Sequence, residues 1–365
     1  MKRLLCIIGG MNAGGAETFL MKIYRSIDKT NYQLDFAVST KEKGFYDEEI
    51  NKFGGKIYHI APKSSNPFSN FSAIKSIVKK NHYRSVLRIS QHSLSALELL
   101  AAKFGGAKIR GFRSSNSDTV SGTKKARLLH KLFLFMPKHF ANVKIAPSSE
   151  AAKFMFGKNS LKKKNVYILK NGIDFSQYCY NEKERRRIRD ELKLNDCFVV
   201  GHIGRFNQQK NHPFLIEIFS EIKKIEKTAK LLLVGMGEKE KEIKSIVKSK
   251  GLSDSVIFCG VRSDIPSILN AIDVFVFPSL YEGMPNTVIE AQACGIPCLI
   301  SDTITKEVKF SNLLSFLPLT LSAKTWAENA LSYKNSKQAI FDIDEKNKYD
   351  VNVSSKIFVD LFFKN

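Results

Sequence analysis

The chain has 365 residues, of which 43% are hydrophobic, so it can form two domains with separate cores and is not expected to be disordered. Its formal net charge of +23 favours an anionic partner, which would be nucleic acid, a phospholipid surface or a phosphorylated substrate, and a generally lysine-rich proteome is the alternative. It has no zinc-finger, RNP or recognition-helix pattern, which argues against nucleic acid, and no run of about 18 apolar residues that would span a membrane.

The cysteines and the N-terminus exclude two further classes. The six cysteines are scattered, without a C-x-x-C pair or histidines at ligand spacing. Neither a zinc site nor a disulfide framework is therefore expected, and the pattern suits a reducing cytoplasm. The basic, apolar start of the chain is interrupted by glycines and turns polar by Asn12, so we interpret it as a first strand and not as a signal peptide.

In chain order, short apolar runs alternate with helical stretches, which predicts repeated βαβ units in two series. The first series has expected strands at 4–9, 34–39, 56–60, 86–89, 108–112, 143–147 and 166–169, with helices from about residue 17 and at 48–53, 74–80 and 93–104. The second has expected strands at 199–203, 230–234, 256–258, 274–277 and 298–300, with helices at 182–192, 214–224 and 238–250. Apolar residues at helical spacing predict a last helix at 353–363, whereas 313–349 has no clear pattern.

The segment 273–302 carries the strongest functional pattern. A buried strand, a loop, a helix opened by Pro285 and Asn286 and a further strand form a β-loop-α-β unit. The loop therefore lies at the carboxyl edge of a parallel sheet, where such sheets bind ligands. Glu282 lies in the loop and Glu290 on the helix, and the N–H groups of Gly283, Met284, Pro285, Asn286 and Thr287 (Pro285 itself lacks one) surround an expected anion site. A sugar joined to a diphosphate and a ribose fits this arrangement.

This segment resembles the E-x7-E signature of retaining glycosyltransferases of family 4, most closely the bacterial exopolysaccharide and capsular polysaccharide enzymes that read SLYEGxPxxxIEAQAxGxPC. The resemblance covers nearly the whole chain. It implies an α/β fold of the GT-B architecture, with two facing Rossmann-like, doubly wound domains. The expected domains are an acceptor-binding domain at 1–175, a nucleotide-sugar-binding domain at 176–349 and a C-terminal helix at 350–365 that packs on the first domain.

Two cations follow the first strand of the second series. Arg205 and Lys210 lie in Gly204-Arg205-Phe206 and Lys210-Asn211, which match the family motif GRFxxxKN. A guanidinium and an ammonium on such a loop can clamp a diphosphate in place of a metal ion. We expect both cations to be catalytic, because negative charge grows on the leaving phosphate in the transition state. Glu282 is expected to be catalytic through its contact with the transferred sugar. The alternative is that they are solvated surface cations.

Three glycine-containing loops are further candidates for substrate binding. Gly14, Gly15 and Glu17 open the first helix, where the resemblance places a loop over the donor phosphates and beside the acceptor. Gly235 lies in a VGxGE-like turn, and Arg262 lies in a loop that in the family holds the nucleobase through backbone groups. The alternative for both is an ordinary turn.

The chain departs from the family at one position. Relatives often read AHSHN at the end of a first-domain strand, with a histidine that points at the transferred sugar, whereas this chain reads GFRSSN up to Asn116. His92, at the end of a neighbouring strand, is the nearest substitute, although a structural role is the alternative. Retaining transfer in this class uses the leaving phosphate to take the acceptor's proton, so no enzymic base is required.

Residues 123–142 combine five basic residues with a run of leucine, phenylalanine and methionine. Such a helix can lie in the interface of an anionic membrane, and a core helix with a charged outer face is the alternative.

Together these features predict a metal-independent, retaining glycosyltransferase without a cofactor. It would move a hexose or N-acetylhexosamine from a nucleotide sugar, with UDP as the expected nucleotide, to a lipid-linked or polysaccharide acceptor at the cytoplasmic face of the membrane. A nucleotide-sugar epimerase or phosphorylase on the same fold, and an inactive glycan- or lipid-binding scaffold, stay open as alternatives. A nicotinamide dehydrogenase is disfavoured, because the first glycine loop lacks the G-x-G-x-x-G spacing.

Overall fold

The computed structural model of the protein describes residues 1–12, 14–115, 124–162, 165–335 and 339–364, with the side chains of 124–126 left out. The chain divides into two compact units. Unit 1 comprises Met1–Gly172 and Lys348–Asn365, and unit 2 comprises Ile173–Asn347. Each unit is described by itself.

The described part of unit 1 contains a parallel sheet of seven strands in the order β3-β2-β1-β4-β5-β6-β7. The strands are β1 (Lys2–Ile8), β2 (Tyr32–Val38), β3 (Ile57–His59), β4 (Ser85–Ser90), β5 (Ile109–Ser114), β6 (Val143–Ala146) and β7 (Tyr167–Ile168). The helices are α1 (Gly15–Ser26), α2 (Asp47–Lys52), α3 (Pro67–Lys80), α4 (Leu97–Gly105), α5 (Lys124–Leu132), α6 (Phe135–Phe140), α7 (Ser149–Phe156) and α15 (Val351–Val359), with short helical turns η1 (Ser93–Ala96) and η6 (Asp360–Lys364).

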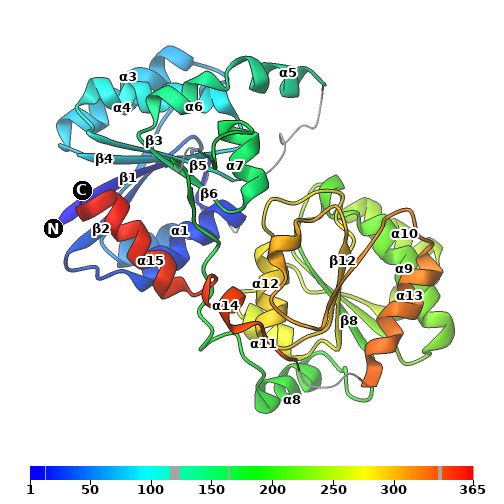
Figure 1. The fold of residues 1–365 in the computed structure, drawn as a ribbon. Helices are drawn as coiled ribbons and strands as arrows, with labels where there is room; N and C mark the ends of the chain where they lie inside the picture. The colour runs from blue at the N-terminus through cyan, green and yellow to red at the C-terminus, as the bar shows by residue number, and fades with distance from the viewer. Residues whose placement is uncertain (13, 116–123, 163–164, 336–338, 365) are drawn as a thin grey trace. The chain divides into compact units, whose positions relative to one another are not determined.

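Strand β1 is buried on both faces, as its continuous apolar run predicts. Leu4 and Cys6 point into a core formed with α1, α15 and η6, whereas Leu5 and Ile7 point into a second core with α3 and α4. This alternation follows from the two-residue period of a strand. Figure 1 shows α3 and α4 on one face of the sheet and α1 and α15 on the other.

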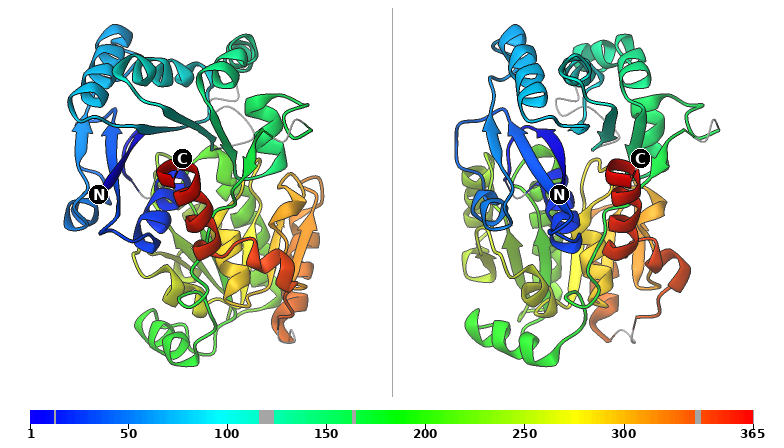
Figure 2. Two further views of the ribbon diagram at one scale, coloured as in Figure 1. Left: turned by 60° about the vertical axis from the view of Figure 1, so that its left-hand side comes forward. Right: turned by 90° about the vertical axis from the view of Figure 1, so that its left-hand side faces the viewer.

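The C-terminal helix α15 lies beside α1 in both views of Figure 2, and their side chains share one core. Phe19 of α1 meets Phe358 of α15 edge-on, with ring centroids 6.4 Å apart. The predicted return of the last helix to the first domain is therefore confirmed.

The described part of unit 2 contains a parallel sheet of six strands in the order β10-β9-β8-β11-β12-β13. The strands are β8 (Val199–Ile203), β9 (Lys230–Val234), β10 (Val256–Phe258), β11 (Val274–Phe277), β12 (Cys298–Ser301) and β13 (Leu314–Leu317). The helices are α8 (Glu182–Glu191), α9 (His212–Ile225), α10 (Glu240–Ser249), α11 (Ile265–Asn270), α12 (Asn286–Ala293), α13 (Ala323–Leu331) and α14 (Ile343–Asn347), with a helical turn η2 (Gln208–Lys210).

The sheet of unit 2 is also covered on both faces. Helices α9, α10 and α13 pack on one face through a core that includes Val200, Leu231 and Trp326. On the other face Gly201 allows close approach, because a Cβ there would lie 2.2 Å from Ile272. The predicted α/β class with two parallel sheets is confirmed.

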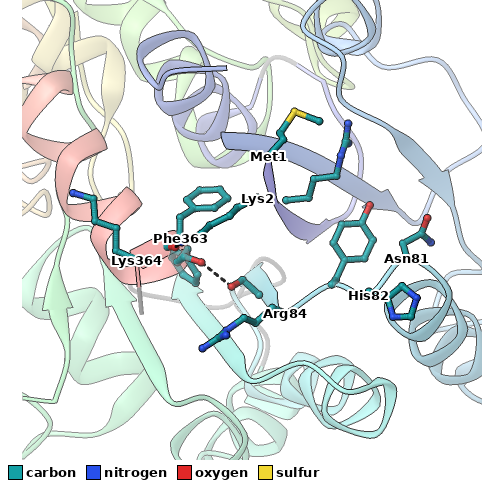
Figure 3. A pocket seen from close by; sticks show the side chains of 11 residues that line it. Met1, Lys2, Asn81, His82, Arg84, Phe363 and Lys364 are labelled. Atoms are coloured by element: carbon teal, nitrogen blue, oxygen red, sulfur yellow. Dashed lines mark hydrogen bonds between the residues drawn. The ribbon is translucent and has the colours of Figure 1, made fainter. Parts of the chain in front are cut away.

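A pocket of about 380 Å³ lies at the amino ends of β1 and β4 in unit 1. Figure 3 shows its lining by residues 1–3, 81–85 and 362–364, with a hydrogen bond from Ser85 Oγ to the carbonyl of Phe362 at 2.7 Å. The pocket is at the opposite edge of the sheet from the carboxyl ends of the strands. Gly14, Gly15, Glu17 and His92 follow β1 and β4 at the carboxyl edge.

Over the described ranges, none of the helices combines the length and the apolar character needed to cross a membrane.

Candidate active site

Loops at the carboxyl ends of β8 and β11 are joined by hydrogen bonds that position the predicted cations. Leu280 N donates to Gln209 O at 2.8 Å, and Gln209 Nε2 donates to Tyr281 O at 2.8 Å. Asn211 Nδ2 donates to Pro278 O at 3.1 Å. The loop that carries Lys210 is thereby held against the loop that carries Glu282.

Two glycines allow the loop after β9 to lie close against the loop after β8. Gly235 has φ +135, and a Cβ there would lie 2.2 Å from Gly204 O. A Cβ on Gly237 would lie 2.4 Å from Phe206 O, and Phe206 N donates to Met236 O at 3.0 Å. Gly235 is thus required by backbone conformation and by space, and it shapes the loop after β9, whereas its role in substrate binding stays a prediction.

Lys210 and Glu282, two of the three residues predicted to be catalytic, form an ion pair in the structure. The distance from Nζ to Oε1 is 2.7 Å, and the two side chains are only 15% and 10% exposed. The ammonium also lies 4.4 Å from the centroid of the Phe277 ring. A cation–π contact and a carboxylate therefore fix the position of this ammonium at the carboxyl edge of the sheet. Arg205, the third predicted catalytic residue, is on the same loop and is exposed.

The start of α12 has the features of an anion site. Pro285 occupies the N-cap position and supplies no side-chain acceptor for the first N–H groups of the helix. Gly283, Met284 and Pro285 are buried, and Asn286 and Thr287 are half-buried. Positive charge of the helix dipole and these N–H groups favour a phosphate or a polarised hydroxyl at this point.

Glu290 lies one turn after Asn286 on α12 and is 5% exposed. A ligand can therefore reach only a small part of its carboxylate. This restriction suits a specific hydrogen bond to a hydroxyl group more than a general electrostatic role.

Arg262 forms ion pairs with acidic residues outside the Lys210–Glu282 pair. Its guanidinium donates to both carboxylate oxygens of Asp264 at 2.8 and 2.7 Å and to Glu191 at 2.9 Å. These hydrogen bonds raise its pKa. The side chain thus links the loop after β10 to α8, and nucleobase binding by the backbone of that loop stays a prediction.

In unit 1, Gly14 is the N-cap residue of α1, Gly15 is its first residue and Glu17 lies in its first turn. The Glu17 carboxylate lies over Gly14, because a Cβ on Gly14 would be 2.4 Å from Oε2. His92 is half-buried just before η1, and burial followed by nearby Lys63 lowers its pKa. Asn116 lies outside the described residues.

The sequence did not single out Gln209 or Ser279. Gln209 bridges two loops, but a glutamine in a polar loop gives no distinctive pattern. Ser279 is fully buried directly after β11, and its Oγ has no hydrogen-bond partner among the described residues. Its place at a strand end could have identified it.

Among the residues that the structure describes, no group of three or more His, Cys, Asp or Glu side chains could hold a metal ion.

Each unit contains a parallel, doubly wound sheet, and unit 2 places a fixed lysine–glutamate pair and a helix start at one sheet edge, an arrangement consistent with a glycosyltransferase of the GT-B class. Residues 197–314 match the family described as glycosyl transferases group 1. The chain is 34% identical over 336 residues to the protein named glycosyltransferase EpsF of Bacillus subtilis (strain 168), covering 90% of this chain and 86% of that protein. The chain therefore belongs to this glycosyltransferase family.

Two further similarities extend the comparison. The UDP-Gal:alpha-D-GlcNAc-diphosphoundecaprenol alpha-1,3-galactosyltransferase of Escherichia coli is 26% identical over 293 residues, covering 74% of this chain and 72% of that protein. The crystal structure of Anabaena Alr3699/HepE in complex with UDP and glucose has a TM-score of 0.74 and 18% identity, covering 99% and 96% of the two chains. At that identity the structural likeness shows the fold, which confirms the GT-B architecture.

Proposed function

We propose that this glycosyltransferase is retaining and metal-independent, and that it transfers a hexose or N-acetylhexosamine from a UDP-sugar to a lipid-linked or polysaccharide acceptor in surface glycan synthesis. The observation that carries the proposal is the Lys210–Glu282 pair beside the start of α12. A protein with the same fold has a structure in complex with UDP, which supports the UDP-sugar donor. The name of a relative contains a diphosphoundecaprenol-linked substrate, which supports the lipid-linked acceptor.

In the proposed reaction the fixed ammonium of Lys210 and the guanidinium of Arg205 neutralise the diphosphate as it leaves. The ion pair with Glu282 pre-organises Lys210, so little reorganisation is needed when charge develops. Glu282 then hydrogen-bonds the sugar, and Glu290 holds the ribose hydroxyls. The leaving phosphate oxygen takes the acceptor's proton on the donor's own face, so the anomeric configuration is kept without a protein base.

The test combines a binding screen with kinetics. A panel of nucleotide sugars is screened for thermal stabilisation, because a ligand that binds only the native form raises the melting temperature. With the best donor, Lys210→Ala is expected to lower kcat at least about 100-fold, as for the loss of one charge-stabilising donor. Glu290→Ala is expected to raise the KM for the donor about tenfold or more, by loss of a hydrogen bond to a charged group.

Lys224→Ala is the matched control, since this lysine lies on the exposed surface of α9 and pairs only with Glu221 among the described residues. Unchanged kinetics in both site variants would overturn the proposal. Product analysis with the donor alone separates a transferase from an epimerase, which needs no acceptor. Full activity in EDTA is expected, and strict dependence on a divalent ion would contradict the metal-independent mechanism.

We also propose that the basic, apolar segment at 123–142 binds the anionic inner face of the plasma membrane. The structure describes 124–142 of it. In α5, Leu128 and Leu132 are 68% and 66% exposed, and Leu129 is also exposed. Arg127 and Lys131 are exposed on the same helix. Apolar side chains flanked by cations suit an interface with acidic lipids.

Sedimentation with vesicles tests this surface. The wild-type protein is expected to bind phosphatidylserine-containing vesicles at low salt and to dissociate as salt is raised. The double variant Leu128→Ser/Leu132→Ser is expected to lose most of this binding. Phe68→Ser is the control, because Phe68 is an apolar residue on α3 that is even more exposed, at 87%. Equal binding of all three proteins would reject the membrane role of this segment.

A further inference from the structure

A buried cluster of charged side chains lies at the carboxyl end of β4 in unit 1. The side chains of Arg88 and Glu98 are 8% and 3% exposed and form an ion pair. Arg88 NH1 also donates to Ile7 O at 2.9 Å. Lys63, from the loop after β3, lies 4.0 Å from the same carboxylate oxygen of Glu98. Two cations thus share one carboxylate, and the cluster carries surplus positive charge.

Lys63 is the member of the cluster that solvent reaches, with its side chain 36% exposed. Its ammonium donates a hydrogen bond to Ser95 Oγ, which lies 2.7 Å from Ser90 Oγ. Ser90 Oγ also accepts from His92 N at 3.1 Å. Because Ser95 Oγ accepts a hydrogen bond from Lys63, the Ser95 hydroxyl can donate its own proton to Ser90 Oγ. The Ser90 hydroxyl can then donate a hydrogen bond to a ligand.

The donors of this cluster fit an oxyanion. An ammonium with two remaining N–H groups and a hydroxyl next to it form charge-assisted hydrogen bonds to phosphate oxygens. The cluster lies at the carboxyl edge of a parallel sheet, where ligands bind. Glu98 is paired with Arg88 in the interior, so its carboxylate only partly neutralises the Lys63 ammonium, and an anionic ligand can still pair with that ammonium.

The charges around Lys63 support this assignment. Burial and the neighbouring Arg88 lower the pKa of Lys63 to about 8, and Glu98 acts in the opposite direction. His92 faces the cluster from the start of η1, and His130 of α5 lies near His92. A bound anion would supply the missing negative charge and restore the stability of the protonated amine.

We propose that Lys63, oriented by Ser95 and Ser90, binds a phosphate oxygen of the acceptor substrate. This inference rests on the proposed function and on the expected acceptor-binding role of residues 1–175, and it takes the acceptor to be joined to its lipid through a diphosphate, as in the name of the Escherichia coli relative. It adds a residue that recognises the anionic part of the acceptor and that none of the motifs in the sequence indicated.

Calorimetry with inorganic pyrophosphate tests the site in the full-length protein, with and without saturating UDP. The wild type is expected to bind pyrophosphate in the presence of UDP, and Lys63→Met to bind it at least about tenfold more weakly, as for loss of a charged donor. Lys103→Met, on the exposed surface of α4, is the control and should bind as the wild type does. Equal affinity of wild type and Lys63→Met would overturn the proposal.

A comparison of lysine with arginine at this position adds a readout that a structural role would not move. Wild-type affinity for pyrophosphate is expected to fall as the pH rises through about 8, because Lys63 loses its proton there. Lys63→Arg stays protonated, so the ratio of its affinity to that of the wild type should rise over the same interval. Parallel profiles for the two proteins would contradict a role for the Lys63 charge.

The source of the phosphate is decided by donor binding. If Lys63→Met keeps the wild-type affinity for UDP and loses only pyrophosphate binding, the anion belongs to the acceptor. A matching loss of UDP affinity would assign it to the donor and overturn the proposal. If the wild type binds no nucleotide sugar, the proposed function fails, whereas the pyrophosphate titration without UDP still decides whether Lys63 is an anion site.

Discussion

Single residues set the shape of the candidate active site in unit 2. The ammonium of Lys210 is fixed by Glu282 and by the Phe277 ring. The loop that carries it is in turn shaped by Gly235, whose backbone has φ +135. Removing the charge of Lys210 is therefore expected to change the kinetics. Adding a methyl group at Gly235 is expected to lower the free energy of unfolding as well.

Gly235→Ala is expected to destabilise unit 2 and to reduce activity together. The new Cβ would be strained at φ +135 and would lie 2.2 Å from Gly204 O, so the loop that leads to Lys210 must move. We expect a loss of at least about 2 kcal/mol in the free energy of unfolding, measured by urea denaturation, and a higher KM for the donor.

Gly251→Ala is the control for this change. Gly251 also has positive φ, +65, but a Cβ there would meet nothing within 4 Å. The cost should be about 1 kcal/mol, with kinetics unchanged. Equal effects of the two substitutions on donor kinetics would show that the contact with Gly204 has no functional role.

At the scale of elements, the last helix completes the core of unit 1. Phe358 and Phe362 pack with ring centroids 4.9 Å apart, and both are almost fully buried. Gly111 of β5 has no Cβ at the point where one would lie 2.5 Å from the Phe362 ring. The C-terminal segment is therefore part of the first unit's interior.

Phe362→Ala should lower the free energy of unfolding of unit 1 by about 3–5 kcal/mol, because it removes a buried aromatic ring and leaves a cavity beside Gly111. Chemical denaturation followed by far-UV circular dichroism measures the loss. Val353→Ala, a change at an exposed position of α15, should cost less than about 1 kcal/mol. A loss below 1 kcal/mol for Phe362→Ala would show that η6 does not contribute to the core.

The elements most strongly patterned in the sequence were predicted well. The expected strands at 199–203, 230–234, 256–258 and 274–277 have the observed bounds, because buried parallel strands are continuous apolar runs between loops. Strand β13 and helices α13 and α14 were not predicted, since the partly buried side chains of 313–349 give mixed patterns.

The candidate site could be predicted only in part. Residue type and loop position indicated Lys210 and Glu282, but their direct ion pair depends on the order of β8 and β11 as neighbours in the sheet. The Lys63 cluster was missed for a related reason. Its members lie on three segments between residues 63 and 98, namely the loop after β3, strand β4 and the region of η1 and α4, and only the fold brings their side chains together.

At the scale of the whole molecule, the charge balance makes stability depend on pH. The net charge of +23 is carried by 58 lysine and arginine residues against 35 acidic ones, so protonation of carboxylates and histidines increases self-repulsion. Two histidines in unit 2 make a specific contribution to this pH dependence of stability. His202 and His212 are buried side by side with ring centroids 4.8 Å apart.

Stability is expected to fall as the pH is lowered from about 6.5 to 4. Burial, followed by nearby Lys210, lowers the pKa of His212 to about 4, and burial lowers that of His202 well below its usual value. The unfolded chain takes up protons at these groups below about pH 6.5, whereas the folded chain does not. His212 alone therefore contributes a loss of up to about 3 kcal/mol, which urea unfolding at pH 7.5 and 4.5 measures.

His212→Phe should weaken this pH dependence, because a phenyl ring can keep the packing on Phe206 and cannot be protonated. The control is His82→Asn, at an exposed position with positive φ that asparagine tolerates. It should leave the pH dependence as in the wild type. If the free energy of unfolding of the wild type, His212→Phe and His82→Asn changed equally with pH, His212 would be excluded as a source of the pH dependence.

The division of the chain has a consequence for protein engineering. Gly172, the last residue before unit 2, lies against Val351 just after it, because a Cβ on Gly172 would be 2.7 Å from the Val351 Cα. Unit 2 is thus inserted at one point of unit 1. A short Gly-Ser bridge from 172 to 348 should yield a free-standing unit 1, and the corresponding second units of relatives should be exchangeable at the same two junctions.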